Sequence, residues 1–168
     1  MTSVELLFDA ELERAVQDEW LLLEAAGVPN QSRHAGASNR PHVTLIWAES
    51  GVTPMPLPSP SLPLGVRLGA PILFGAGRRG VVLARLVVPS AGLLRLQSAI
   101  HDQQGSATGI ASTTEPRAWT PHVTLSRAVP LDQLAVALGV LDLRRDLVGD
   151  AVAARHWDAP TATVTPLV

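Results

Sequence analysis

The chain has 168 residues, of which 46% are hydrophobic and 17% charged, so its composition is that of a folded domain and not of a disordered chain. It contains no cysteine, which excludes disulfides, thiolate metal sites and thiol nucleophiles. All 13 basic residues are arginine, against 15 acidic residues, which excludes lysine Schiff-base chemistry and a broad basic surface for long nucleic acid.

The first half of the chain predicts strand, helix, polar loop and strand, followed by an extended proline-rich segment and two more strands. In chain order these elements cover residues 4–8, 9–26, 28–40, 41–45, 50–66, 64–68 and 72–74. The helix has apolar residues at helical spacing and a stop at Gly27. Five prolines in the extended segment exclude a membrane helix there.

The second half predicts the same succession of strand, helix, loop and strand, and then a helix and two final strands. These elements cover residues 84–88, 90–104, 106–120, 121–125, 131–141, 151–157 and 162–167. The sequence Pro-His-Val-Thr-Leu ends both successions, at residues 41–45 and again 80 residues later at 121–125. Because a five-letter motif and its surroundings recur at one offset, we interpret residues 1–168 as one domain of two related lobes, 1–80 and 81–168.

Each motif presents a polar and an apolar face, since side chains alternate along a strand. His42 and Thr44 point one way, and Val43 and Leu45 point the other way into their lobe. The second copy repeats this with His122 and Thr124. The expected fold is therefore α+β, a bilobal duplication about a pseudo-two-fold axis. Each lobe is expected to be an antiparallel sheet with helices on its outer face, with the polar faces meeting in a cleft between the lobes.

Two imidazoles and two hydroxyls across a cleft suit in-line displacement at phosphorus. The attacking oxygen loses a proton on one side of the phosphate while the leaving oxygen gains one on the other. One imidazole can act as general base and the other as general acid near neutral pH, and the threonines can donate to the non-bridging oxygens. This chemistry requires neither metal nor cofactor. Two other interpretations of the motifs remain. In one, the histidines and threonines are surface residues on two homologous strands without a role in catalysis. In the other, the two histidines bind a metal ion, although the sequence supplies no third ligand at close spacing.

At these residues the sequence resembles the two-histidine (2H) phosphoesterase superfamily, and within it the bacterial 2′-5′ RNA ligase-like, RNA 2′,3′-cyclic phosphodiesterase group. The resemblance implies hydrolysis of a nucleoside or RNA 2′,3′-cyclic phosphate, usually to the 2′-phosphate, and in some members reversible 2′-5′ ligation without ATP. It assigns His42 and His122 as the acid–base pair and Thr44 and Thr124 as phosphate binders. The second motif is followed by Ser126 and Arg127, and this arginine resembles the one with which the family's motif ends.

Three further residues are candidates for the cleft or the core. The resemblance to the last residues of the family's motif implies that Arg127 contacts the phosphate or the base. Strict alternation of side chains along the strand would instead point Arg127 away from the site. Phe8 is placed either against a substrate base or in the core. Trp47 has the parity of Val43 and is expected in the core, while Trp119 either lines the cleft or braces the loop before the second motif.

The expected partner is one nucleotide or RNA terminus carrying a 2′,3′-cyclic or 2′-5′ phosphodiester, since a formal charge of −2 does not suit a long polymer. The acidic N-terminal stretch lacks a signal for secretion, so a cytoplasmic monomer without membrane contact is expected. Two other functions stay open. One is a 2H activity on a small non-RNA nucleotide, and the other is a module that binds a nucleotide or RNA end without turnover.

Overall fold

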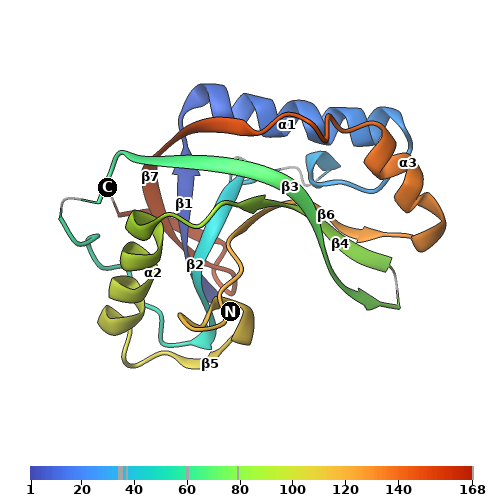
Figure 1. The fold of residues 1–168 in the computed structure, drawn as a ribbon. Coiled ribbons are helices and arrows are strands. Elements are labelled where there is room, and N and C mark those ends of the chain that lie inside the picture. The colour runs from blue at the N-terminus through green and yellow to red at the C-terminus, as the bar shows by residue number, and fades with distance from the viewer. Residues whose placement is uncertain (34–35, 37, 60, 79, 168) are drawn as a thin grey trace.

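The computed structural model describes residues 1–33, 36, 38–59, 61–78 and 80–167 (Figure 1). Over these ranges the chain forms an eight-stranded antiparallel sheet with α-helices packed on it, which confirms the predicted α+β class. The elements are β1 (Thr2–Phe8), α1 (Ala10–Ala25), β2 (His42–Ser50), β3 (Leu64–Gly77), β4 (Gly80–Val87), α2 (Ala91–Gln103), β5 (Thr108–Ile110), β6 (His122–Val129), α3 (Leu134–Gly139), β7 (Leu147–Asp158) and β8 (Thr163–Pro166).

Both long helices begin at side chains that accept backbone N–H groups. The Asp9 carboxylate accepts from the N–H groups of Glu11 at 3.0 Å and Leu12 at 2.8 Å. The Ser90 hydroxyl oxygen accepts from the N–H of Leu93 at 3.1 Å. Each cap satisfies donors that a helix leaves free in its first turn, so both helices start directly after β1 and β4, as the repeat predicted.

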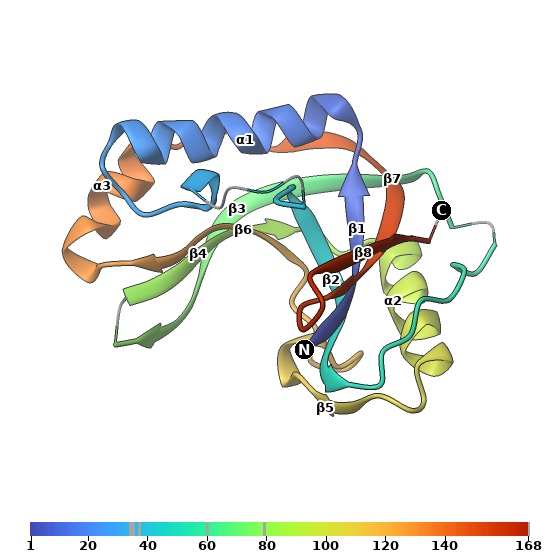
Figure 2. The ribbon, with the colours of Figure 1, turned by 180° about the vertical axis from the view of Figure 1, so that it is seen from behind.

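The order of the strands in the sheet has the symmetry expected of the duplication. Neighbouring strands run β5-β2-β1-β7-β3-β4-β6, while β8 pairs with β7 outside this path (Figure 2). Without β5, the order is symmetric when β2 is exchanged with β6, β1 with β4 and β7 with β3. β3 and β7 meet at the centre, from Leu64 opposite Ala151 to Leu68 opposite Leu147. Each half of the sheet therefore takes one strand from the other half of the chain.

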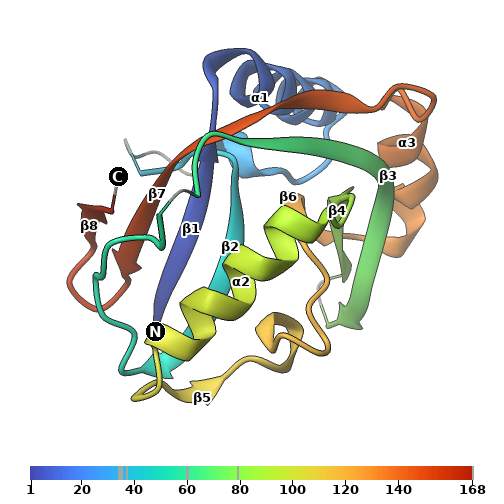
Figure 3. The same ribbon diagram turned by 60° about the vertical axis from the view of Figure 1, so that its left-hand side comes forward.

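The helices cross over in the same way. Glu19 of α1 forms a buried ion pair with Arg85 of β4, and α2 packs against β2, where the Gln97 amide donates to the Leu45 carbonyl at 3.2 Å (Figure 3). Arg85 also donates to the carbonyl of Gly69 at 3.0 Å. Because α1 also packs against β6, each motif strand is supported by a helix from the other sequence repeat.

The sequence predictions differ from the structure mainly in the divergent segments. Residues 64–77 form one strand instead of two, with an irregular register between Leu68 and Pro71. The predicted helix 131–141 is a 3₁₀ turn followed by the short α3, and β5 lies in a segment predicted as loop. In the described part of the chain, no helix has the length and apolar character needed to cross a membrane.

Candidate active site

The two motif strands present His42, Thr44 and Thr124 to one cleft, whereas His122 is not among the residues that line it. In β2, His42 lies opposite Leu7 of β1 and Thr44 lies opposite Glu5. In β6, His122 lies opposite Leu86 of β4 and Thr124 opposite Ala84. All four are half-buried, while the alternate residues Val43, Leu45, Val123 and Leu125 are fully buried. The predicted division of each motif into a polar and an apolar face is confirmed.

Both histidines are held in the same way. The Nδ1 of His42 lies 2.7 Å from the carbonyl oxygen of Arg40, and the Nδ1 of His122 lies 2.8 Å from that of Thr120. A carbonyl oxygen only accepts, so each Nδ1 must carry the proton it donates. Nε2 is then left in each ring as the nitrogen that takes up or releases a proton.

The carbonyl groups of the two motif threonines are each held by a tryptophan from outside their own strand. The Trp20 indole of α1 donates to the Thr124 carbonyl at 3.2 Å, and the Trp119 indole donates to the Thr44 carbonyl at 3.1 Å. This hydrogen bond ties the loop before the second motif to β2, and Trp119 is not among the residues that line the cavity, so of its two predicted roles the structure favours bracing the loop. Neither threonine hydroxyl makes a hydrogen bond with any residue in the described ranges, so both are open to a ligand.

A β-bulge at the last residue of each motif changes which side chains reach the cleft. Val4 of β1 lies opposite Ile46, but Glu5 lies opposite Thr44, so Leu45 is an extra residue. Leu125 is the corresponding extra residue in β6. A bulge of this kind reverses the alternation of faces beyond it. Trp47 and Arg127, which each lie two residues beyond their motif, are thereby turned to the cleft face.

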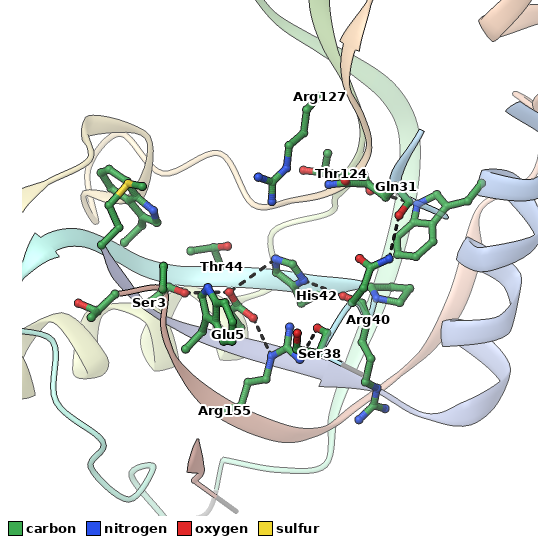
Figure 4. Close-up of a pocket in the computed structure, with 18 residues that line it drawn as sticks. Ser3, Glu5, Gln31, Ser38, Arg40, His42, Thr44, Thr124, Arg127 and Arg155 are labelled. Atoms are coloured by element: carbon green, nitrogen blue, oxygen red, sulfur yellow. Dashed lines mark hydrogen bonds and ion pairs between the residues drawn. The ribbon is translucent and has the colours of Figure 1, made fainter. Parts of the chain in front are cut away.

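Arg127 therefore lines the cleft, and the objection from strict alternation is removed. Its guanidinium projects from β6 into the cavity (Figure 4) and makes no ion pair among the described residues. The prediction for Trp47 was wrong, because the bulge turns it out of the core and into the cavity lining. The proposal that Phe8 stacks on a base is also corrected: Phe8 is 1% exposed and packs in the hydrophobic core.

The cavity has a volume of about 350 Å³, and most of its lining comes from the half of the sheet that carries His42. It is lined by Met1, Thr2, Ser3, Glu5, Trp20, Gln31, Ser38, Asn39, Arg40, Pro41, His42, Thr44, Trp47, Thr124, Arg127, Arg155, Trp157 and Ala159. Thr44 and Thr124 face it from opposite strands. A ligand bound here would lie mainly over β1, β2 and β7.

The surroundings of the two histidines are not symmetric. The Glu5 carboxylate lies 3.7 Å from Nε2 of His42 and pairs with Arg155 at 2.7 Å. The equivalent of Glu5 beside the second motif is Ala84, whose neighbour in β3 is Ile72. On that side the ring of Phe74 lies 4.5 Å from the ring of His122, centroid to centroid.

This asymmetry affects the proton affinities of the groups. Burial lowers the pKa of His122 below its ordinary value, and the positive charge of His42 lowers it further, against the opposing effect of the hydrogen bond to Thr120. Burial alone raises the pKa of Glu5, but the charges of His42 and Arg155 and the hydrogen bonds from Ser3 and Arg155 outweigh it, so the pKa of Glu5 is lowered. His122 is therefore neutral, and Glu5 ionised, at neutral pH.

Comparison with known proteins gives a likeness to solved structures. No family model matches the chain, and no curated protein matches it. Among solved structures, the crystal structure of E. coli LigT complexed with 3′-AMP is similar over 99% of this chain and 94% of that chain, with a TM-score of 0.50 and 15% identity. The chain has a LigT-like fold. The fold that the duplicated motif predicted is thus found in a protein of known structure.

The cavity brings together the imidazole of His42, the hydroxyls of Thr44 and Thr124 and the guanidinium of Arg127, while His122 of the second motif is not among its lining residues. Imidazoles exchange protons near neutral pH, while hydroxyls and a guanidinium stabilise negative charge on oxygen. Within the described ranges, no group of three or more His, Asp or Glu side chains is placed to hold a metal ion. The arrangement is able to hold an anion in the cavity beside the His42 imidazole, and the second motif strand carries a second imidazole, His122.

Proposed function

We propose that the protein is a 2H-type phosphodiesterase that hydrolyses the 2′,3′-cyclic phosphate of a nucleotide or an RNA end. The observation that carries this proposal is the paired geometry of His42 and His122. Each ring has Nδ1 fixed on a backbone carbonyl and Nε2 left for proton transfer, and each is accompanied by a threonine hydroxyl that has no hydrogen-bond partner in the part of the chain that the structure describes. The LigT-like fold and the motif resemblance described above support the same activity.

In the proposed reaction, the cyclic phosphate lies between the two motifs. Thr44, Thr124 and Arg127 hold the non-bridging oxygens, where negative charge persists through the transition state. A water oxygen forms a bond to phosphorus as the bond to the 3′-oxygen breaks, which leaves the 2′-phosphate. The water proton goes to the base, and the 3′-oxygen receives a proton from the acid.

The environments of the two histidines support one assignment of these roles. His122 is neutral at neutral pH because burial lowers its pKa, so it is ready to accept the proton from water. The Glu5 carboxylate lies 3.7 Å from Nε2 of His42, so a negative charge stands beside the nitrogen that would donate the proton. We therefore assign His122 as general base and His42 as general acid.

The aromatic side of the cavity supports a nucleoside substrate. Trp47 and Trp157 both line the cavity, and indole rings bind nucleobases by stacking. Arg127 is a single cation without an ion pair among the described residues, which suits one phosphate better than a polymer backbone.

The test is hydrolysis of nucleoside 2′,3′-cyclic phosphates, with product identity determined by phosphorus NMR. We expect a 2′-phosphate product and turnover that persists in the presence of a chelator. A ribonucleotide oligomer with the same end, compared with the mononucleotide, shows whether RNA or a small nucleotide is preferred. No hydrolysis of cyclic or 2′-5′ linked nucleotides over a broad pH range would contradict the proposal.

A further inference from the structure

The floor of the cavity consists of two rows of side chains that cross three neighbouring strands. In the first row, Ser3 of β1 lies between Trp47 of β2 and Trp157 of β7. In the second row, Glu5 of β1 lies between Thr44 and Arg155. Paired residues on adjacent strands share a face of the sheet, and all six line the cavity.

The two indoles are spaced for one flat ring between them. They stand on strands that are separated by β1, and two strand spacings amount to about 10 Å. Stacked atoms lie about 3.5–4 Å apart, so one planar ring between two indoles needs about 7–8 Å and two rings need more than about 10 Å. The interval therefore admits one ring. An edge of such a ring would face down onto Ser3 and Glu5 in β1.

The floor below that edge offers hydrogen-bond acceptors. Ser3 uses its hydroxyl proton to donate to Oε1 of Glu5 at 2.8 Å, which leaves its oxygen lone pairs. Glu5 is an ionised carboxylate, because the neighbouring charges of His42 and Arg155 lower its pKa despite its burial. Arg155 donates Nε to Oε2 of Glu5 at 2.7 Å and Nη1 to the Ser38 carbonyl at 2.8 Å, which fixes the carboxylate in place.

We propose that this floor selects guanine, with the base between Trp47 and Trp157 and its Watson–Crick edge on Glu5 and Ser3. This inference rests on the proposed function and names the substrate base for the same cleft. Guanine presents two adjacent donors on that edge, N1–H and the N2 amino group. Adenine and cytosine place an acceptor nitrogen beside their amino group, and uracil flanks its single N–H with two carbonyls. Those bases set an acceptor against the acceptors of the floor, which is unfavourable.

The direct test compares kcat/KM for the 2′,3′-cyclic phosphates of guanosine, inosine, adenosine, cytidine and uridine. Guanosine is expected to exceed adenosine, cytidine and uridine by about tenfold to a hundredfold, the usual discrimination of a two-point base contact. Inosine keeps N1–H but lacks the N2 amino group, so it is expected between them. Equal kcat/KM for all five substrates would overturn the inference.

Two variants assign the preference to the floor. Glu5→Gln replaces an acceptor oxygen by an amide donor and is expected to bring the ratio of guanosine to adenosine within about threefold. Ser3→Ala keeps the Glu5–Arg155 ion pair and is expected to lower the ratio by about two- to tenfold. Because each ratio is measured within one protein sample, a loss of folded material does not change it. If Glu5→Gln fails to fold, the ratio measured for Ser3→Ala is the test, and an unchanged ratio in Ser3→Ala would contradict the inference.

Glu13→Gln is the matched control. Glu13 also pairs with an arginine that lines the cavity, Arg40, but it is not part of the floor. The base preference of Glu13→Gln is expected to equal that of the unmodified protein. If the ratio of guanosine to adenosine in Glu13→Gln fell as far as it does in Glu5→Gln, net charge and not the floor would set the base preference. That result would contradict the inference.

A binding measurement separates this inference from the proposed function. Quenching of tryptophan fluorescence is expected to give a Kd for GMP about tenfold or more below that for AMP. Preferential binding of GMP without hydrolysis of any cyclic phosphate would leave the inference standing and remove the proposed function. Hydrolysis of the cyclic phosphates with equal Kd values for GMP and AMP would leave the proposed function standing and overturn the inference of guanine selection.

Discussion

Replacing Thr44 or Thr124 by valine tests whether these hydroxyls stabilise the reacting phosphate. Valine keeps the branched shape of threonine and suits a strand. Both side chains are half-buried, and neither hydroxyl has a partner among the described residues, so the folded state loses no hydrogen bond. The change in stability is therefore expected to stay within about 0.5 kcal/mol, or roughly 2 °C in Tm.

The effect on catalysis is expected to be much larger. Removing one preorganised donor from a site of developing charge costs about 3–4 kcal/mol, which corresponds to a decrease of about 10²–10³ in kcat. The assay is the steady-state hydrolysis of a 2′,3′-cyclic nucleotide, with Tm measured on the same samples by calorimetry. A kcat within threefold of the unmodified protein in either variant, or a kcat loss matched by a large loss of Tm, would refute the assigned role.

Three other predictions follow from named contacts. Because the base His122 must be neutral and burial lowers its pKa, the acid limb of the kcat/KM profile should lie below about pH 6.5. Phe74→Ala should admit water and move this limb to higher pH, whereas an unmoved limb would exclude the effect of burial. Glu19→Gln should lower stability by about 3–5 kcal/mol by leaving the buried charge of Arg85 unpaired, and an unchanged Tm on calorimetry would contradict this. Arg127→Gln should lower kcat/KM by about 10- to 100-fold if Arg127 holds the phosphate, and unchanged kinetics would exclude that contact.

Much of the framework could be predicted because it depends on local patterns. The strands, the two capped helices and the inward-facing Val43, Leu45, Val123 and Leu125 follow from period-two and period-3.6 spacing. The duplication then relates the two motifs without any knowledge of packing. These features require only neighbours in the sequence and one internal comparison.

The composition of the cavity could not be predicted because it depends on partners distant in sequence. The bulges at Leu45 and Leu125 are set by pairing with β1 and β4, and strict alternation therefore misplaced Trp47 and Arg127. Glu5 and Arg155 are joined only because β7 crosses to the first half of the sheet. The hydrophobic neighbours of Phe8 likewise become apparent only in the packed core.

The most direct test of the account is the hydrolysis of a 2′,3′-cyclic nucleotide by His42→Ala, His122→Ala and the double variant. Each imidazole is assigned one proton transfer, so each single variant is expected to lose about 10²–10⁴ in kcat while keeping its Tm. Since the two transfers belong to one displacement, the double variant should lose less than the product of the two single losses. Full activity in either single variant would contradict the account.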